Sequence, residues 1–220
     1  MRIGIEVNGV LRDTIGKFTQ LYEKHMIDEN DNEETILKID ITDENNLESV
    51  VEDKFNYEVL SPVTSLNLLN HFKFRNEEEL YSFMYEDFAM GIFGHASSTE
   101  MSTFNDLNEF YLNNRDDNEI VIISDEIGKS KPATLFFLSK FGCLVEKYIF
   151  YSKITEDSIW ENFDVLVTSN PELIKKSKKP CIKYNTQYNE DSESKYSITK
   201  LKELQSIIDK IKKDDVKSIQ

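Results

Sequence analysis

The sequence predicts an α/β fold: a mainly parallel five-stranded sheet, flanked by helices and interrupted by a large insertion. Five short runs rich in Ile, Val and Tyr recur along the 220 residues. They lack the polar alternation of strands that face water, so we expect both of their faces to be covered. Helical patterns separate the last four runs, which is the βαβ arrangement of a parallel sheet. More than a hundred residues with a different sequence pattern separate the first run from the second, which predicts an inserted subdomain.

The chain opens with its first strand and then enters the insertion. Residues Ile3–Val7 form that strand. Within the insertion, Asp28–Asp53 holds eleven acidic side chains and one Lys around an alternating run, Leu37–Ile41, which predicts a small antiparallel element. Apolar residues then recur at steps of three and four over Glu77–Phe93 and Thr103–Leu112, which predicts two helices. We therefore predict a core of residues 1–18 and 113–220, and an acidic, helical cap of residues 19–112.

Strands and helices alternate in the second half of the chain. We predict strands at Ile120–Ser124, Lys147–Tyr151, Asp164–Thr168 and Cys181–Tyr184, and helices at Ala133–Phe141 and Pro171–Ser177. After a polar stretch, apolar side chains recur mostly at three-residue steps, which predicts an amphipathic closing helix: Ile198, Leu201, Leu204, Ile207, Ile208 and Ile211. We expect this helix to lie on the body of the domain, with docking of a partner as the alternative.

Charge and composition exclude several classes of function. The 41 acidic side chains outnumber the 26 basic ones, and the formal net charge is −15. Because the basic side chains do not cluster, we expect no binding to nucleic acid. Cys143 and Cys181 are too few and too far apart for a metal knuckle or a disulfide framework. A strand pattern stands where a signal peptide would, and no apolar run is long enough to span a membrane, which predicts a soluble, cytoplasmic protein.

Two polar side chains stand where open α/β sheets bind their ligands. Glu6 and Asn8 are two residues apart at the carboxyl end of the first strand, so they share one face of it. In Glu6-Val-Asn-Gly-Val-Leu the chain resembles the opening Asp-x-Asp-Gly-x-Leu motif of haloacid dehalogenase superfamily phosphatases, and most of all their deoxyribonucleotidase-like branch. The resemblance implies a Rossmann-like fold with a cap inserted after the first strand.

Later segments carry the same resemblance in the same order. Ser124 ends the second strand as the superfamily's second-motif Ser or Thr does, and Lys131, followed by Pro132, matches its third-motif lysine. The run from Asp164 to Ile174 parallels a fourth motif, and residues 80–96 are similar to a cap segment of the branch. Each motif alone is a weak signal, so the specific evidence is their order and spacing.

The resemblance also implies a chemistry for which this chain lacks residues. Active members use an aspartate nucleophile that forms an aspartyl-phosphate, a second Asp as general acid, and Mg²⁺ held by acids of the first and fourth motifs. Here Glu6 is one methylene too long for the nucleophile, and Asn8 cannot transfer a proton as a carboxylic acid does. Thr168 and Ser169 replace the fourth-motif acids. We therefore assign no catalytic residue, no metal site and no cofactor.

The preferred hypothesis is a catalytically degenerate protein that serves as a binding or assembly component with a protein partner. The composition of the chain, with 22 Lys, 4 Arg and 18 Asn, indicates an A/T-rich genome. Together with the resemblance, this composition suggests a bacteriophage protein, with a role in a virion or replication assembly.

Two alternatives stay open. One is an Mg²⁺-dependent phosphatase or 5′-nucleotidase acting on a nucleotide or small phosphate ester. It would use Glu6 with Ser124 and Lys131, and carboxylates recruited from Asp125 or Glu126. Asp164 is a poor candidate, because it begins its strand and belongs to the opposite end of the sheet. The other is an inactive sensor that binds a phosphate or nucleotide weakly through the positions Asn8, Gly9, Ser124 and Lys131.

Simple structural roles compete with these assignments. Ser124 would merely end a strand, and Lys131 would be solvated or would form an ion pair with Glu6. Three isolated histidines, without ligand spacing, predict no transition-metal site: His25, His71 and His95. Four aromatic residues are expected to pack a core rather than to stack on a base: Tyr81, Phe83, Tyr85 and Phe88. The acidic run is expected to be a solvated surface, with docking of a basic partner as the alternative.

Overall fold

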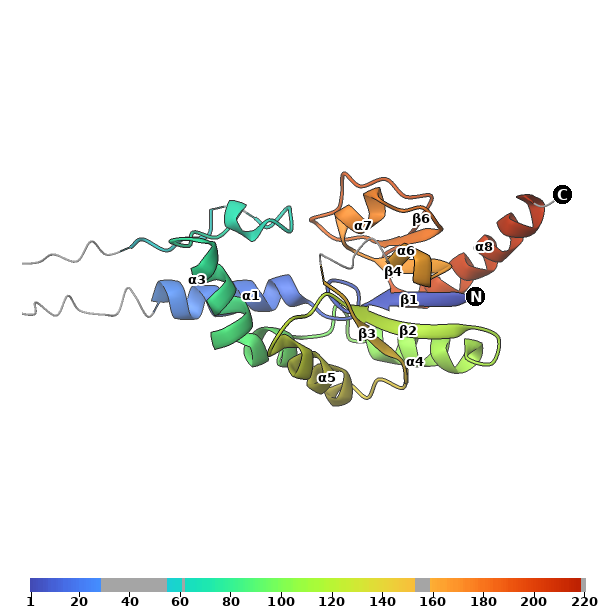
Figure 1. Ribbon diagram of the computed structural model, residues 1–220, viewed down its shortest axis with the longest axis horizontal. Coiled ribbons are helices and arrows are strands. Elements are labelled where there is room, and N and C mark those ends of the chain that lie inside the picture. Colours follow the sequence, from blue (N-terminus) through green and yellow to red (C-terminus); the bar gives the residue numbers. More distant parts are fainter. Residues whose placement is uncertain (29–54, 61, 153–158, 219–220) are drawn as a thin grey trace, which may run out of the picture.

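The computed structural model describes residues 1–28, 55–60, 62–152 and 159–218, and it confirms the predicted α/β fold (Figure 1). The sheet is parallel throughout and has the strand order β3-β2-β1-β4-β5-β6. It has six strands rather than the five predicted. The strands are β1 (Arg2–Glu6), β2 (Glu119–Ser124), β3 (Tyr148–Phe150), β4 (Val165–Thr168), β5 (Cys181–Tyr184) and β6 (Tyr196–Ile198).

Helices connect and cover these strands. The regular helices are α1 (Thr14–Tyr22), α3 (Glu77–Tyr81), α4 (Thr103–Asn114), α5 (Ser130–Lys140), α6 (Ile159–Asn162), α7 (Pro171–Lys175) and α8 (Leu204–Ser218). Wider π-helical turns form η1 (Glu23–Asp28), η3 (Ser82–Asp87) and η4 (Met90–Gly94), and tighter 3₁₀ turns form η2 (Leu68–Asn70) and η6 (Leu201–Glu203). The single helix predicted over Glu77–Phe93 is therefore a succession of short helical pieces. None of the helices in the described part of the chain is long and apolar enough to cross a membrane.

Alternation along the central strands places apolar side chains on both faces of the sheet. In β2, Ile120 and Ile122 pack in one core and Val121 and Ile123 in the other, as expected for a parallel strand covered on both sides. The first core includes apolar residues of α4, α5 and α8, and the second includes those of α6 and α7. Gly4 lets β1 pack closely against the second core, because a Cβ at this position would lie 2.9 Å from the Leu166 side chain.

A third core lies in the predicted cap, beyond the carboxyl ends of β1 and β2 (Figure 1). Phe18 and Tyr22 of α1 are fully buried there against Phe72, Phe74 and other aromatic rings. Three of the four aromatic residues expected to pack a core do so, namely Phe83, Tyr85 and Phe88. Tyr81 does not, because its side chain is largely exposed.

The division of the chain between the cores differs from the predicted limits at both ends of the insertion. Helix α4 lies inside the range 19–112 predicted for the cap, but Phe104, Leu107 and Phe110 pack in the core against the sheet. At the other end, Phe18 belongs to the cap core although we placed it in the sheet domain. The acidic run and the antiparallel element predicted within it lie outside the described residues, except for Asp28 at the end of η1.

The predicted closing helix begins later than its apolar spacing indicated. Ile198 belongs to β6, where Tyr196 and Ile198 are buried and Ser197 is exposed. A 3₁₀ turn then leads into α8, which starts at Leu204. The three-residue steps from Ile198 to Leu204 fit a strand followed by a turn as well as they fit a helix. The sequence periodicity alone therefore could not separate these two structures.

Candidate functional site

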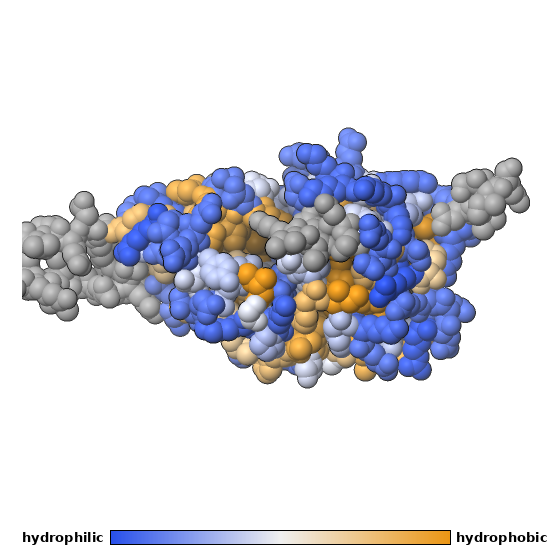
Figure 2. Space-filling model, in the orientation of Figure 1, coloured by the Kyte–Doolittle hydropathy of each residue, from blue (hydrophilic) through white to orange (hydrophobic). Residues whose placement is uncertain are grey.

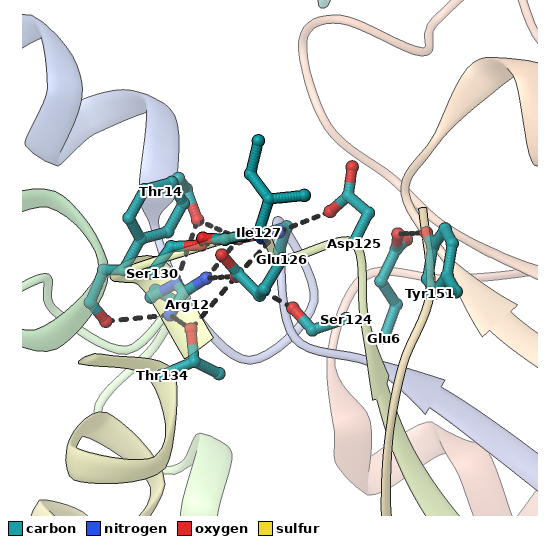
Figure 3. A network of polar contacts seen from close by, with 12 residues as sticks. Glu6, Arg12, Thr14, Ser124, Asp125, Glu126, Ile127, Ser130, Thr134 and Tyr151 are labelled. Carbon is teal, nitrogen blue, oxygen red and sulfur yellow. Dashed lines mark hydrogen bonds and ion pairs between the residues drawn. The ribbon is translucent and has the colours of Figure 1, made fainter. Parts of the chain in front are cut away.

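The carboxyl ends of β1 and β2 bring together most of the polar residues that the sequence singled out. After Glu6, the chain makes a tight loop in which Gly9 has a positive φ of 73° and the amide of Arg12 donates to the carbonyl of Val7 over 2.9 Å. Asp13 then caps α1, its carboxylate accepting a hydrogen bond from Gly16. This loop places Asn8 and Arg12 beside the residues that follow β2. Figure 3 shows Arg12 against Glu126 at this position.

Arg12 is the centre of the polar network and is fully buried. Its Nη2 donates to Asn8 Oδ1 over 2.6 Å and to Glu126 Oε1 over 2.5 Å. The other guanidinium nitrogens donate to the Thr14 hydroxyl, the Thr134 hydroxyl and the Phe93 carbonyl. The guanidinium carbon also lies 5.0 Å from the centroid of the Phe93 ring. All three nitrogens therefore have partners, which is what a buried charge requires.

Glu126 balances this charge from the loop after β2. Its Oε1 accepts hydrogen bonds from the Ser124 and Thr134 hydroxyls, each over 3.0 Å, besides that from Arg12. Its Oε2 is buried without a hydrogen-bond partner among the described residues. The Ser124 hydroxyl is thus directed at a carboxylate of the same chain, rather than being free to donate to a phosphate.

Asn8 links the cation to a second carboxylate. Its Oδ1 accepts from Arg12 and from Thr14, and its Nδ2 donates to Asp125 Oδ1 over 2.7 Å. This arrangement needs an acceptor on one side and a donor on the other, which an amide supplies. An aspartate at this position would place two carboxylates in contact, so the Asn suits the arrangement of charges around it.

Glu6 is also fully buried, and its two oxygens face hydroxyl groups. Tyr151 donates to Oε1 over 2.7 Å and Thr168 donates to Oε2. Burial, together with the negative charge of Asp125, raises the pKa of Glu6 to about 8. Burial and the neighbouring Glu126 raise the pKa of Asp125 to about 6. At neutral pH Glu6 is therefore mostly a neutral acid, which is a poor nucleophile.

Lys131 and Gly9 lie outside the hydrogen bonds of side chains described above. Lys131 is exposed, and its Nζ lies 5.9 Å from the centroid of the Phe150 ring. Within the described residues it forms no ion pair with Glu6, so that prediction is wrong. A Cβ on Gly9 would lie 1.8 Å from the Tyr188 hydroxyl and 2.2 Å from the Ser169 hydroxyl, which shows how closely these two side chains cover the loop.

The residues present do not fit a magnesium ion. A hard divalent cation needs several oxygen ligands, but the guanidinium of Arg12 already binds Asn8 Oδ1 and Glu126 Oε1 and would repel a second cation. No group of three His, Cys, Asp or Glu residues is arranged to hold a metal in the part of the chain that the structure describes. Asp164, as predicted, lies at the other end of the sheet, where its carboxylate accepts from the amide of Arg2.

Sequence reasoning missed Arg12, Thr134 and Tyr151. Arg12 was visible as one of only four arginines, two residues before a helix, but no sequence signal marks it as buried. Thr134 lies on the buried face of α5, and Tyr151 follows β3, so both reach the site only through tertiary packing. Two surface hollows, of about 530 and 570 Å³, lie elsewhere, beside Lys183 and Ser197 of β5 and β6 and at the amino end of β2.

Comparisons with known proteins identify the fold. No family model and no curated protein sequence matches the chain. Among solved structures, it is similar to a protein from Burkholderia xenovorans described as a haloacid dehalogenase-like hydrolase. The TM-score is 0.53 at 11% identity, and the match covers 96% of this chain and 97% of that one. At this identity the likeness shows the fold alone, and it agrees with the parallel sheet described above. The chain has the haloacid dehalogenase-like fold.

Proposed function

We propose that this chain is a binding or assembly component that keeps the hydrolase-like fold without aspartyl-phosphate chemistry. The observation that carries the proposal is the Arg12 guanidinium, which is fully buried between Asn8 and Glu126. It supplies an internal cation where the carboxyl ends of β1 and β2 meet. The polar groups there bind one another, so substrate and metal have few free ligands.

The state of Glu6 supports the same conclusion. A nucleophilic carboxylate must be ionised and must reach the phosphorus atom. The two oxygens of Glu6 face the Tyr151 and Thr168 hydroxyls rather than open space, and burial raises its pKa to about 8, which disfavours the ionised form at neutral pH. The weak phosphate sensor is also disfavoured, because Ser124 donates to Glu126 while Lys131 lies over Phe150. A role in a phage virion stays a prediction from the composition.

Phosphate release tests the proposal directly. The purified chain is incubated with Mg²⁺ and either nucleoside monophosphates or p-nitrophenyl phosphate, in parallel with Glu6→Gln. We expect no turnover above the buffer for either protein. Turnover by the wild type that Glu6→Gln abolishes would establish the phosphatase alternative and overturn the proposal. Because a trace contaminant would act equally in both preparations, the variant also serves as its control.

Thermal unfolding with the same nucleotides separates the remaining alternative. A ligand that binds the folded chain raises its midpoint of unfolding, and the rise grows with the logarithm of the ligand concentration. We expect no such rise. Stabilisation that is lost in Lys131→Gln, without turnover, would favour the sensor over the assembly component.

A further inference from the structure

The outer face of α5 carries two large apolar side chains between two lysines. The buried face carries Ser130, Ala133, Thr134, Phe137 and Leu138, at steps of three and four residues. Leu135 and Phe136 lie on the opposite face and are 44% and 42% exposed. A surface helix usually keeps its large apolar side chains on its buried face, so Leu135 and Phe136 are unusual on the outer face of α5.

This face continues onto β3, which ends the sheet. Tyr148 and Ile149 of β3 are also more than one-third exposed. The ammonium of Lys131, in the first turn of α5, lies over the Phe150 ring and so joins the helix to the strand. Figure 2 shows hydrophobic surface running from β3 onto α5 between hydrophilic regions. Single exposed apolar residues are common, but a continuous patch that includes an edge strand is typical of an interaction site.

Basic side chains border this patch, although the chain as a whole is acidic. Residues 128–152 contain four Lys and one Glu, in a chain of net charge −15. Lys129 and Lys147 pair with Glu86 and Glu119. Lys131 and Lys140, at the two ends of the outer face of α5, pair with no carboxylate among the described residues. Nine residues at 1.5 Å each separate them by about 14 Å along the helix axis.

We propose that the α5–β3 surface, formed by Lys131, Leu135, Phe136, Lys140 and Tyr148, binds an acidic, amphipathic segment of a partner protein. Apolar side chains of the segment pack on Leu135 and Phe136, and flanking carboxylates meet the two lysines. The inference rests on the proposed function, since it names the chemistry of the partner that a binding component would take.

An anionic membrane offers similar chemistry, but the charge distribution favours a protein segment. Interactions between exposed charges are screened beyond about 8 Å at physiological salt. A short segment therefore responds mainly to Lys131 and Lys140, which it covers. A bilayer faces a whole side of the molecule and meets the acidic groups as well, so a chain of net charge −15 is repelled from it.

Labelled peptides test this surface on the full-length chain. One 15-residue peptide carries a Leu/Phe stripe flanked by Glu, and its twin carries Lys in place of every Glu. Binding is followed by fluorescence anisotropy, and vesicles containing phosphatidylserine are offered in parallel. We expect the acidic peptide to bind at least tenfold more tightly than the basic one, with weaker binding at high salt. The proposed surface is contradicted if the two peptides bind equally, if neither peptide binds, or if the chain binds only the vesicles.

Variants locate the binding. One double variant, Leu135→Ser/Phe136→Ser, removes the apolar contacts of the proposed surface. A second, Lys131→Glu/Lys140→Glu, reverses its charge. Each is expected to lower the affinity for the acidic peptide at least tenfold. The charge reversal should also make the basic peptide the tighter ligand. Leu66→Ser/Met101→Ser changes exposed apolar residues elsewhere and is the matched control. An equal loss in this control would contradict the assignment. Phosphate turnover would contradict the proposed function alone, whereas failure of peptide binding would contradict this surface alone.

Discussion

Arg12 and Glu126 form an ion pair of 2.5 Å in which both side chains are completely buried. Desolvation lowers the pKa of the Arg12 guanidinium, and the facing carboxylate of Glu126 raises it. A pair of this kind adds little net stability over a well-packed apolar pair, but the loss of one partner leaves a charge in the interior. The pair therefore fixes the arrangement of the loop after β1 more than it stabilises the fold.

The first prediction concerns this pair. Arg12→Met leaves Glu126 without its counter-ion and should lower the free energy of unfolding by about 3–5 kcal/mol. The double variant Arg12→Met/Glu126→Gln removes both charges and should recover part of that loss. Urea titrations of the wild type, both single variants and the double variant give the coupling between the two residues. Lys73→Met, which breaks an exposed pair with Glu58, is the control and should change stability by less than about 1 kcal/mol. A double variant less stable than either single variant would contradict this account.

The second prediction follows from the protonation of Glu6. Its pKa is about 8 in the folded chain against 4.5 for the ordinary group, so between these values the folded state binds a proton that the unfolded state has lost. The contribution of Glu6 is therefore fully present below pH 4.5 and falls as pH rises to about 8, by an amount on the order of several kcal/mol. In the Glu6→Gln variant the side chain at position 6 cannot titrate, so this loss of stability with rising pH does not occur.

Thermal unfolding between pH 5 and pH 8 checks the sign. The midpoint of Glu6→Gln relative to wild type should increase with pH. Glu119→Gln is the matched control, because Lys147 and Arg2 lower the pKa of that exposed carboxylate, and it stays ionised across the whole window. A difference between Glu6→Gln and wild type that is constant with pH would show that Glu6 does not titrate there.

The third prediction concerns Gly9, in the loop after β1, and the two side chains that cover it. Gly9→Ala combines a positive φ of 73° with overlap against the Tyr188 and Ser169 hydroxyls. Gly142→Ala has a similar φ of 66° but meets no atom within 4 Å, so it reports the backbone strain alone, about 1–2 kcal/mol. We expect Gly9→Ala to lose at least about 2 kcal/mol more than Gly142→Ala in denaturant titrations. Equal losses would mean that Tyr188 and Ser169 move aside freely.

The fourth prediction tests the aromatic core of the cap. Phe18 is fully buried, with its ring 4.8 Å from that of Phe72 and 5.4 Å from that of Phe83. Phe18→Ala should cost about 3–5 kcal/mol, because the cavity would be lined by rings that cannot all move into it. Hydrogen exchange should show the largest loss of protection in α1 and η3. Leu66→Ala, at an exposed position of the same region, should have little effect. A loss of protection confined to the strands would contradict the assignment of Phe18 to the core of the cap.

The sequence by itself determined the sheet and the identity of its main strands. Runs such as Ile120–Ser124 predict buried strands because their side chains are apolar on both faces, which is a local property. The tertiary structure decided the sixth strand and the limits of the cap. Ile198 suits a strand as well as a helix, and α4 could have packed in either core.

The candidate site divides in the same way. Glu6 and Asn8 were predicted from their spacing at the end of a strand, because alternation alone puts them on one face. Their partners come from three other parts of the chain: Asp125 after β2, Tyr151 after β3 and Thr168 in β4. Arg12 is buried only because Phe93, Thr134 and Glu126 surround it. The sequence determined which residues stand at the strand ends, and only the tertiary structure decided their charges, because desolvation and counter-ions depend on neighbours distant in the chain.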